Sequence, residues 1–492
     1  MRPSINFLAV DLGASNGRVF CGRWNGKKFE LHELHRFFNR SVDVVGHLHW
    51  DVLRLWSEVK TGLSYYSQQY NKEVAGIGVD AWGVDFAMLD KAGRLLGNPY
   101  SYRDRRTEQI SKAVFAQVPE REVFKKTGVQ SWPINSLFQI FSMVQNADPQ
   151  LEAASTFLMI PDLFTFWLCG VRAVELTVGS TSEMLQIDHP QWAYDLLTRL
   201  GIPSDFLPSI TKPGTTLGPL RSALASEMNF TGTPPVLAVA THDTASTVAA
   251  IPGMNQDSIF ISSGTWSLMG VQTARPVTSP QALNLGFSNE RGASGSVLLL
   301  CNIPGLWPLQ ECMRQWQLRG SSYTWGGLTR LAEEAKGFRS LINPDALDFV
   351  APQDMLVSIR DFCRRTNQQM PDSAGAFTRC CIESLSLRYR QVLESLESLV
   401  QRRLSCVRVA GGGCLNRLLC QFTANATNRA VIAGPVEASV LGNIMTQAIA
   451  IGHIKNFSEG SEAIASSIRL SSFEPRKTDA WEEAFQRFRK LL

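Results

Sequence analysis

One stretch of the sequence, residues 235–270, brings a lone carboxylate close to a hydroxyl-rich turn. The apolar run at 236–240 predicts a buried strand, which ends in Thr-His-Asp at 241–243. A second apolar run leads into Ser-Ser-Gly-Thr at 262–265, a turn whose hydroxyl and backbone N–H groups suit phosphate oxygens. The pattern predicts that Asp243 deprotonates a hydroxyl acceptor while the turn holds a phosphoryl donor.

A related pattern lies near the start of the chain. Residues 7–20 begin with alternating apolar side chains that lead to Asp11. A Gly-Ala-Ser-Asn turn follows, and after it come Arg-Val-Phe at 18–20. This pattern predicts a β-hairpin whose tip exposes backbone N–H groups that can bind phosphate. A plain surface turn is the alternative interpretation. Because a carboxylate at the end of a strand can hold the Mg²⁺ carried by a nucleotide, Asp11 is the candidate magnesium residue.

Three consecutive glycines at 411–413 form a third candidate site. They lie between a predicted strand at 406–410 and a predicted helix at 416–428. Glycines at such a junction let a phosphate or a flat ring approach the backbone and the helix N-terminus. The strand-turn-strand pattern at 261–266 also repeats that at 10–15. We therefore expect two related halves, each beginning with a phosphate-binding hairpin.

The apolar run at 74–85 ends in residues suited to a sugar. It predicts a strand that presents Asp80, Trp82, Gly83 and Asp85. Gly83 would let a ligand approach the backbone, either carboxylate would accept hydrogen bonds from sugar hydroxyls, and Trp82 offers a face for a sugar ring. A purely structural role for Trp82 is an equally open interpretation.

Helices must support these turns. Apolar residues at helical spacing predict an amphipathic helix over 51–70, with Asp51 as its N-cap. A second apolar stripe over 381–400 predicts a helix of the core. Asn302, and Gln310 on a predicted helix, add polar side chains near a glycine.

The composition is that of an ordinary globular protein. The chain has 492 residues, of which 44% are hydrophobic and 19% charged, which is enough for two large domains. The formal net charge is +4 without a dense Lys/Arg run, which argues against nucleic-acid and membrane partners. Asp11 interrupts the N-terminal apolar segment before a signal-peptide core is complete, so we expect a cytoplasmic protein. The 10 cysteines include no CxxC pair, so neither a zinc ribbon nor a thioredoxin motif is indicated.

A nucleotide would have to be held by dispersed loops, because the sequence contains no P-loop, protein-kinase or Rossmann motif. The motifs that it does contain, in order between residues 9 and 444, are VDLGASNGR, GVDAWGVDF, YRDRR, ATHDTAS, SSGTWSLMG, CNIPGLW, AGGGCLN and AGPVEASVLGNI. With these motifs the sequence resembles the FGGY carbohydrate kinases, within the superfamily of actin, hexokinase and the heat-shock ATPases. WGVDF, THDTAS and SGTWSLMG, in that order, resemble the branch of the family that acts on L-rhamnulose.

The resemblance implies an α/β fold of two ribonuclease-H-like domains, as in actin and hexokinase, flanking an interdomain cleft. The N-terminal domain is expected at 1–250, on the sugar and phosphate side, and the C-terminal domain at 251–492, on the nucleotide side. The Pro-Gly break at 252–253 is the hinge candidate. Asp243 then belongs to the first domain and Thr265 to the second.

The implied activity is Mg²⁺- and ATP-dependent phosphorylation of L-rhamnulose at its C1 hydroxyl, giving L-rhamnulose 1-phosphate and ADP in L-rhamnose degradation. By position, Asp243 is the catalytic proton acceptor and Asp11 positions Mg²⁺ through water. The implied sugar-binding residues are Gly83, His242, Asp243, Thr244 and Asn302. The implied ATP-binding residues are Ala14, Ser15, Asn16, Gly17, Arg18, Thr265, Gln310 and Gly412.

Two further expectations concern charge and redox state. The helix that follows Asp243 has a dipole whose positive end should keep this carboxylate ionised. The resembled family also has members with disulfides, and Cys363 and Cys380 occupy one such pair of positions, whereas Thr423 and Thr427 replace another pair. We expect free thiols at Cys363 and Cys380 in a reducing cytoplasm.

The expected partners are a ketose and ATP, and the expected assembly is a monomer or homodimer. One alternative is another FGGY ketose kinase that acts on fuculose, xylulose or ribulose. A second alternative, from another class, is a nonenzymatic ATP-dependent sugar-binding regulator. The presence of Asp11, Asp243 and all three glycine-containing turns argues against the regulator.

Overall fold

The computed structural model describes residues 4–70, 73–350 and 352–492, and it divides into two compact units. The first unit comprises Met1–Gly253, Thr273–Leu299 and Ala438–Ser467, and the second comprises Met254–Gln272, Leu300–Glu437 and Ile468–Leu492. The sequence placed a single boundary at residue 250, whereas each unit of the structure combines three segments. Ala438–Ser467 clusters with the first unit because its helix packs on the central strands of that unit's sheet.

The first unit is built on a six-stranded sheet in the order β11-β12-β6-β1-β2-β3. Its strands are β1 (Ile5–Leu12), β2 (Asn16–Trp24), β3 (Phe29–Phe38), β6 (Gly76–Ala81), β11 (Thr215–Pro219) and β12 (Pro235–Ala238). The predicted N-terminal hairpin is confirmed, because β1 and β2 pair antiparallel from Ile5 opposite Trp24 to Leu12 opposite Gly17. Strands β1, β6 and β12 are parallel to one another, so their carboxyl ends meet at one edge of the sheet.

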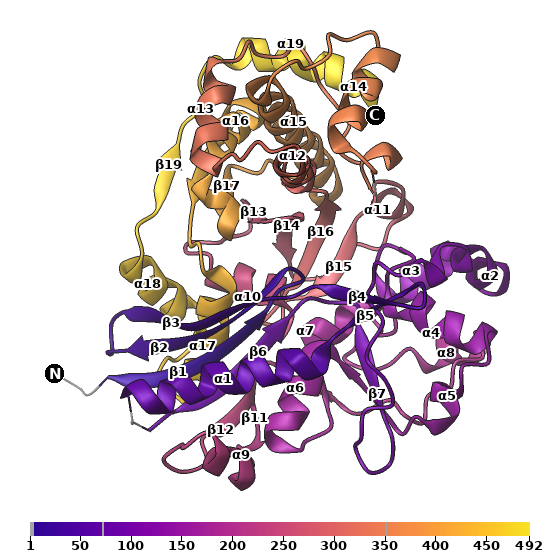
Figure 1. Ribbon diagram of the computed structural model, residues 1–492, viewed down its shortest axis with the longest axis vertical. Helices are drawn as coiled ribbons and strands as arrows, with labels where there is room; N and C mark the ends of the chain where they lie inside the picture. The colour runs from indigo at the N-terminus through magenta and orange to yellow at the C-terminus, as the bar shows by residue number, and fades with distance from the viewer. Residues whose placement is uncertain (1–3, 71–72, 351) are drawn as a thin grey trace. The chain divides into compact units, whose positions relative to one another are not determined.

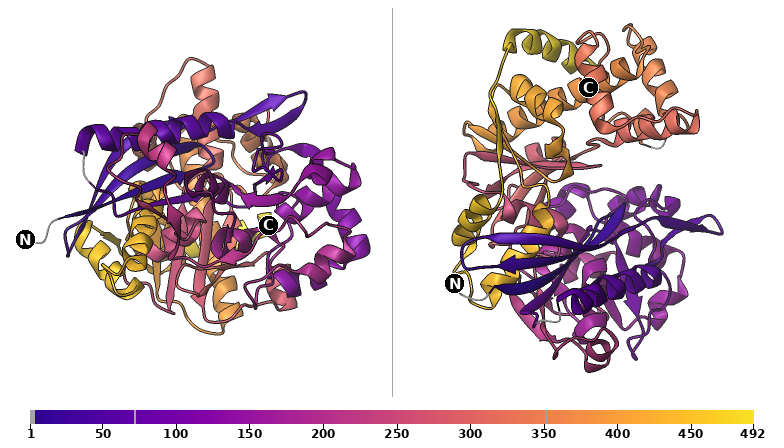
Figure 2. Two further views of the ribbon diagram at one scale, coloured as in Figure 1. Left: turned by 90° about the horizontal axis from the view of Figure 1, so that it is seen from below. Right: turned by 60° about the vertical axis from the view of Figure 1, so that its left-hand side comes forward.

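Helices cover both faces of this sheet. The predicted amphipathic helix is confirmed as α1 (Val52–Tyr70), whose first turn is capped by the Asp51 carboxylate, and it packs on β2 and β3 (Figures 1 and 2). On the other face, α17 (Ala438–Ala450) packs on β1 and β6. Gly22, Gly76 and Gly78 make room for α17, since a Cβ at each would overlap one of its side chains or lie within 2.7 Å of it. The glycines of the strands therefore set how closely this helix approaches.

Shorter elements complete the first unit. Its other strands are β4 (Ser41–Val44), β5 (His47–Trp50), β7 (Phe86–Leu89), β8 (Thr156–Met159), β9 (Val174–Glu175), β10 (Ile210–Thr211) and β15 (Ser288–Arg291). Its other helices are α2 (Ile110–Gln117), α3 (Glu120–Thr127), α4 (Ser136–Gln145), α5 (Pro149–Ala153), α6 (Ile160–Cys169), α7 (Leu176–Gly179), α8 (Tyr194–Arg199), α9 (Ser222–Glu227), α10 (Asp243–Ala250), α11 (Pro280–Asn284) and α18 (Phe457–Ser467).

The run at 74–85 is shorter as a strand than the sequence predicted. Only β6 (Gly76–Ala81) is extended, and the chain turns before β7 begins at Phe86. Val84 adopts a φ of 65°, and its N–H donates to the hydroxyl of Thr181 at 3.0 Å. Because this backbone conformation cannot continue a strand, Trp82, Gly83 and Asp85 lie in a loop.

The sheet of the second unit repeats the plan of the first. Its strands follow the order β16-β14-β13-β17-β18-β19. They are β13 (Ser258–Ser263), β14 (Ser267–Thr273), β16 (Val297–Ile303), β17 (Cys406–Ala410), β18 (Ala430–Ala433) and β19 (Ser471–Phe473). An antiparallel hairpin, β13–β14, is followed by parallel pairing of β13 with β17 and of β17 with β18, as for β1–β2, β6 and β12. The predicted second copy of the hairpin is thus confirmed.

The second unit contains six α-helices in the part of the chain that the structure describes. They are α12 (Trp307–Leu318), α13 (Trp325–Glu334), α14 (Met355–Arg365), α15 (Ala374–Val400), α16 (Arg417–Thr427) and α19 (Thr478–Phe488). The predicted apolar stripe lies on α15, where Ile382, Leu385, Tyr389, Val392 and Leu396 are buried. Throughout the described ranges, no helix is both long and apolar enough to cross a membrane.

Candidate active site

Asp11 lies at the carboxyl end of β1, in register with Arg18 of β2 and Asp80 of β6. Its side chain is 4% exposed and forms an ion pair with Arg18. Ser439, at the start of α17, donates a hydrogen bond of 2.8 Å to Oδ2 of Asp11. The predicted magnesium residue is therefore held in place by one cation and one hydroxyl.

Asp80 is a second carboxylate at this edge of the sheet, and it is fully buried. Asn443 of α17 donates to its Oδ1 at 2.6 Å. Among the residues that the structure describes, no partner donates a hydrogen bond to its Oδ2. Burial, together with the negative charge of Asp11, raises the pKa of Asp80 well above its usual range.

The surroundings of Asp11 fit a hydrated Mg²⁺. The mutual repulsion of Asp11, Asp80 and Asp243 leaves negative charge that a divalent cation would compensate. Within the described residues, no group of three or more His, Cys, Asp or Glu side chains forms a ready-made metal site. Because Mg²⁺ keeps several waters and binds through one or two carboxylates plus substrate phosphates, such a group is not required.

The first hairpin contains five of the residues expected to bind ATP, in its turn and at the start of β2. Its backbone is fixed by Asn39, whose side-chain amide donates to the carbonyl of Gly13 at 2.9 Å and whose N–H donates to that of Ser15 at 3.0 Å. Ser15 is exposed, and Ala14 and Asn16 are half-buried. Gly17 is buried, and a Cβ there would overlap the ring of Phe37. Packing therefore explains the glycine at position 17.

Asp243 is brought to the same edge by the segment after β12. The N–H of Ala81, at the end of β6, donates to the carbonyl of Thr241 at 2.9 Å, which extends the parallel pairing to His242. Asp243 then begins α10. Its side chain is 33% exposed, in contrast to Asp11 and Asp80. Of these three carboxylates, Asp243 has the most surface available to a substrate.

The pKa of Asp243 is shifted in the direction opposite to the one expected from the helix dipole. The pKa of Asp243 is raised, because the surrounding protein disfavours its charge and Asp11 adds repulsion, while His242 lowers it. The hydroxyl of Thr244 donates to Oδ1 of Asp243 at 3.2 Å. Desolvation outweighs the favourable field at the start of this eight-residue helix.

Two buried carboxylates near His242, Glu290 and Glu175, were not predicted from the sequence. Nδ1 of His242 lies 3.2 Å from Oε2 of Glu290, and its Nε2 lies 3.4 Å from Oδ1 of Asp243. Glu175 accepts hydrogen bonds at Oε2 from the N–H and hydroxyl of Thr241, at 3.0 and 2.8 Å. Glu290 stands 47 residues from Asp243 in the short strand β15, whose polar sequence Ser-Asn-Glu-Arg carries no local signal of burial.

The sugar-binding interpretation of Asp85 is wrong, because the protein itself occupies this carboxylate. Its Oδ2 accepts from the indole N–H groups of Trp50 and Trp82, at 2.6 and 3.0 Å, and from the N–H of Tyr102 at 3.2 Å. Its Oδ1 accepts from the amide of Gln139 at 2.9 Å. Asp85 is fully buried, and burial raises its pKa to about 6. It organises the aromatic residues around it.

The structure favours the structural interpretation of Trp82. Its ring packs on that of Trp50, with centroids 4.6 Å apart, and only 5% of the residue is exposed. Gly83 is half-buried, and a Cβ there would lie 2.7 Å from the hydroxyl of Thr181. The expected approach of a ligand to Gly83 stays a prediction.

In the second unit, the hairpin turn is anchored to the start of α12. The N–H of Leu306 donates to the carbonyl of Gly264, and that of Trp307 to the carbonyl of Thr265, each at 3.2 Å. Gly305 permits this approach, since a Cβ there would lie 2.6 Å from the carbonyl of Thr265. Thr265, Asn302 at the end of β16 and Gln310 on α12 are each half-buried.

Gly411 and Gly413 lie against Ser263 of the same hairpin, whereas Gly412 between them does not. Gly411 has a φ of 81°, which favours glycine. Gly413 is buried, and a Cβ there would overlap the side chain of Ser263. Gly412 is exposed, and a Cβ there would meet no atom within 4 Å. Gly412 thus has open space beside it, as expected of a glycine that faces a ligand.

The predicted site residues fall into two groups. Those of the first unit are Asp11, Ala14, Ser15, Asn16, Gly17, Arg18, Gly83, His242, Asp243 and Thr244. Those of the second unit are Thr265, Asn302, Gln310 and Gly412. Within the first group, Asp11 and Asp243 gather at one sheet edge. Within the second group, Ser263 connects two of the turns. It pairs with Ser267 across the turn that contains Thr265, and it lies against Gly411 and Gly413, which flank Gly412.

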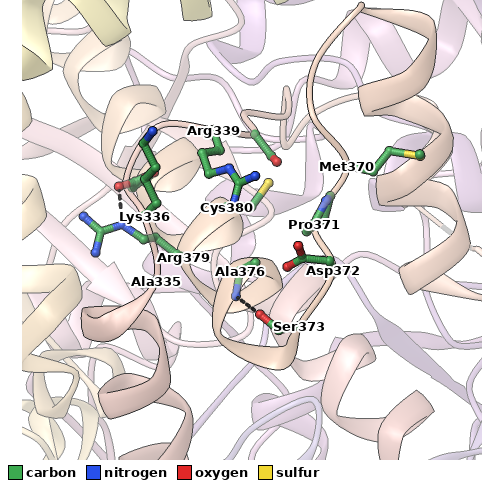
Figure 3. Close-up of a pocket in the computed structure, with 12 residues that line it drawn as sticks. Ala335, Lys336, Arg339, Met370, Pro371, Asp372, Ser373, Ala376, Arg379 and Cys380 are labelled. Atoms are coloured by element: carbon green, nitrogen blue, oxygen red, sulfur yellow. Dashed lines mark hydrogen bonds and ion pairs between the residues drawn. The ribbon is translucent and has the colours of Figure 1, made fainter.

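A cavity elsewhere in the second unit contains none of these residues. It has a volume of about 90 Å³ and lies at the start of α15, where Lys336, Arg339 and Arg379 surround it together with Asp372 (Figure 3). Arg379 is already paired with Glu383 at 2.7 Å. Cys380 lies at the wall of the cavity, and the structure places no disulfide between it and Cys363.

Comparison with known proteins gives a consistent family. Residues 6–250 match the N-terminal domain of the FGGY family of carbohydrate kinases, and residues 259–451 match its C-terminal domain. A rhamnulokinase of Bacteroides thetaiotaomicron is 40% identical over 487 residues, which cover 99% of each chain. A rhamnulokinase of Pectobacterium atrosepticum is 37% identical over 488 residues, which cover 99% of this chain and 96% of that one.

Solved structures share the fold over nearly the whole chain. A gluconate kinase from Lactobacillus acidophilus aligns with a TM-score of 0.82 at 15% identity, covering 99% of this chain and 98% of that one. A xylulose kinase from the same organism aligns with a TM-score of 0.82 at 16% identity, covering 99% and 97%. The two hairpins, the matched domains and the near-complete alignments agree, and the chain belongs to the FGGY family of carbohydrate kinases.

Proposed function

We propose that this protein transfers the γ-phosphate of ATP to the C1 hydroxyl of L-rhamnulose, giving L-rhamnulose 1-phosphate and ADP. The observation that carries the proposal is Asp243, a carboxylate that is one-third exposed beside two buried ones. The choice of sugar rests on full-length relatives that are named rhamnulokinases. The reaction would serve L-rhamnose degradation in the cytoplasm, with the protein acting as a monomer or homodimer.

In the proposed reaction, the C1 oxygen bonds to the γ-phosphorus as the bond to the β,γ-bridging oxygen breaks and ADP leaves. Asp243 accepts the hydroxyl proton late in the transfer. The transition state of phosphoryl transfer is loose, so catalysis depends mainly on positioning and charge stabilisation. The raised pKa of Asp243 suits this role, because a base is more effective when its pKa is nearer the working pH.

The remaining predicted residues divide the binding of the two substrates. We assign sugar contacts to Gly83, His242, Thr244 and Asn302, in addition to Asp243. We assign ATP contacts to Ala14, Ser15, Asn16, Gly17, Arg18, Thr265, Gln310 and Gly412. Asp11 would hold Mg²⁺ through water, and bound Mg²⁺ would neutralise charge on the phosphates.

The decisive experiment is a coupled ADP-release assay with L-rhamnulose, fuculose, xylulose and ribulose. We expect the highest kcat/KM with L-rhamnulose and a 1-phosphate product by ³¹P NMR. A higher kcat/KM with another ketose would replace the proposed sugar. ATP binding without any sugar-stimulated turnover would instead favour a nonenzymatic regulator.

A further inference from the structure

A buried carboxylate, Glu290, contacts the histidine that lies next to the proposed catalytic base, Asp243. Its side chain is 7% exposed, and its Oε2 lies 3.2 Å from Nδ1 of His242, whose side chain is also 7% exposed. The other ring nitrogen, Nε2, lies 3.4 Å from Oδ1 of Asp243. Glu290, His242 and Asp243 thus contact one another in series, from a buried carboxylate to a partly exposed one.

The backbone fixes the position of Glu290 from both sides. The preceding residue, Asn289, donates from its N–H and its side-chain amide to the carbonyl of Gly128, at 2.7 and 3.0 Å. The N–H of the following residue, Arg291, donates to the hydroxyl of Ser180 at 2.9 Å. With both neighbours tied down and its side chain buried, Glu290 has little freedom to leave His242.

The neighbouring carboxylates favour one protonation state of the His242 imidazole ring. A neutral ring has a lone pair on one nitrogen, which would repel a carboxylate oxygen, whereas an imidazolium presents an N–H at both nitrogens. A carboxylate oxygen lies within 3.4 Å of each ring nitrogen, and the contact of Nδ1 with Glu290 is an ion pair without hydrogen-bond alignment. The doubly protonated ring, which is positively charged, therefore fits this pocket best. Glu290 and Asp243, together with the more distant Glu175, raise the pKa of His242 despite its burial.

We propose that Glu290 is a positioning residue of the phosphoryl-transfer site, which holds His242 so that its Nε2 faces Oδ1 of Asp243. Both neighbouring side chains, His242 and Thr244, then engage the same oxygen of the base. Oδ2 is the oxygen that these two side chains do not engage, and it is assigned to the sugar hydroxyl. This assignment rests on the proposed function, whereas the Glu290–His242 pair itself does not.

The test begins with ligand-free protein, so that it does not depend on the identity of the sugar. In ¹⁵N-histidine NMR, with the signal of His242 assigned by its loss in His242→Gln, we expect His242 to titrate at lower pH in Glu290→Gln than in the wild type. The sign follows because Glu290→Gln removes a negative charge that stabilises the imidazolium. An unchanged titration would overturn the proposal.

Kinetics then test the positioning role with whichever ketose is turned over. Glu290→Gln is expected to lower kcat roughly 10–100-fold, the range found when a carboxylate that orients a metal-bound histidine is lost. Its KM for ATP should not change, and the alkaline limb of its pH profile should move to lower pH. In a His242→Gln background, the same change should have little further effect, because the pair acts as one unit. Additive losses would overturn the proposal.

Two further variants separate this role from general stability. Glu183→Gln is the control, since Glu183 is another buried carboxylate of the first unit, but it accepts hydrogen bonds from Asn135 at 2.8 Å and from Ser131 and does not contact His242. Its pH profile should match that of the wild type. If Glu290→Gln does not fold, Glu290→Asp replaces it as the test, because this variant keeps the negative charge. His242 should then titrate at the same pH as in the wild type, while kcat is reduced. Titration of His242 at a lower pH in Glu290→Asp would contradict the proposal. Failure of every ketose would refute the proposed function, while the NMR titration would still decide the Glu290–His242 pair.

Discussion

The two hairpins of the molecule, β1–β2 and β13–β14, share a backbone plan and differ in chemistry. Each precedes a parallel strand in its sheet and has a glycine in its turn, Gly13 in the first and Gly264 in the second. In each turn the glycine N–H donates to a carbonyl at 2.8 Å. The first hairpin carries Asp11 and Arg18, whereas the second carries serine hydroxyls, of which Ser267 contacts Tyr389 at 2.6 Å.

This difference shows how one fold supplies two kinds of site. The first hairpin lies beside ionisable carboxylates whose repulsion must be compensated. At the second hairpin, burial raises the pKa of Tyr389 to about 12, so this residue stays neutral at physiological pH. Charged side chains thus mark the first hairpin, while neutral hydroxyls and glycines form the turn of the second.

The largest effect is expected for the loss of the proposed proton acceptor in the first unit. Asp243→Asn removes the proton acceptor and should lower kcat by roughly 10²–10⁴-fold, as loss of a general base commonly does. ATP should still bind, which calorimetry with a nonhydrolysable analogue would check. Near-normal turnover by this variant would refute the assignment of Asp243.

The glycine turn of the second unit offers a matched pair. Gly413→Ala should cost about 1–3 kcal/mol of unfolding free energy, because the new methyl group overlaps Ser263. Gly412→Ala should change stability by no more than about 0.5 kcal/mol, since its Cβ meets open space. If Gly412 contacts ATP, however, the methyl group should raise the KM for ATP roughly 10-fold or more. Urea unfolding and steady-state kinetics distinguish the two variants, and equal stability losses would contradict this explanation.

A pH comparison would sharpen the contrast in charge. The pKa of Asp80 is raised in the folded protein, so its contribution to stability is present below the pKa of the unfolded chain and is lost as pH rises. Asp80→Asn keeps the acceptor for Asn443 and removes the repulsion from Asp11. At pH 8, we expect the free energy of unfolding to be higher for the variant than for the wild type. Between pH 5 and pH 8, this free energy should fall less for the variant than for the wild type, as urea unfolding at each pH would show. Tyr389→Phe is the control from the second hairpin, and its pH slope should match that of the wild type.

The smallest effects concern the hydrogen bond that supports each hairpin. Ser439→Ala removes a bond to a carboxylate and should cost about 1.5–3 kcal/mol. Tyr389→Phe removes a bond between neutral groups and should cost about 0.5–1.5 kcal/mol. Urea unfolding of the two variants measures the difference, and a larger cost for Tyr389→Phe would reverse the comparison.

Much of the framework could be predicted from local patterns. Periodicity predicted both hairpins, α1 and the apolar stripe of α15, while three glycines marked the junction after β17. These features depend on residues that are close in sequence, so a short window contains their signal. The strand predicted over 74–85 was too long because the turn at Val84 is stabilised by Thr181, which lies 97 residues away.

The partners of the site residues could not be predicted in the same way. Four donors from separate segments occupy Asp85, which from the sequence was one of two candidate acceptors for sugar hydroxyls. Ser439 reaches Asp11 across 428 residues of chain, and Glu290 reaches His242 from β15. A single sequence carries no signal for such distant pairs.

The order of the elements, the two glycine-bearing hairpins and the residue types available for chemistry can be read from the chain, because they follow from periodicity and turn propensity. Which carboxylates are buried, which one is exposed and which side chain contacts Nδ1 of His242 became clear only from the folded protein. Burial and neighbouring charge set these properties, and both depend on long-range packing. Asp243 illustrates the difference, since its place at a helix start was predictable but the direction of its pKa shift was not.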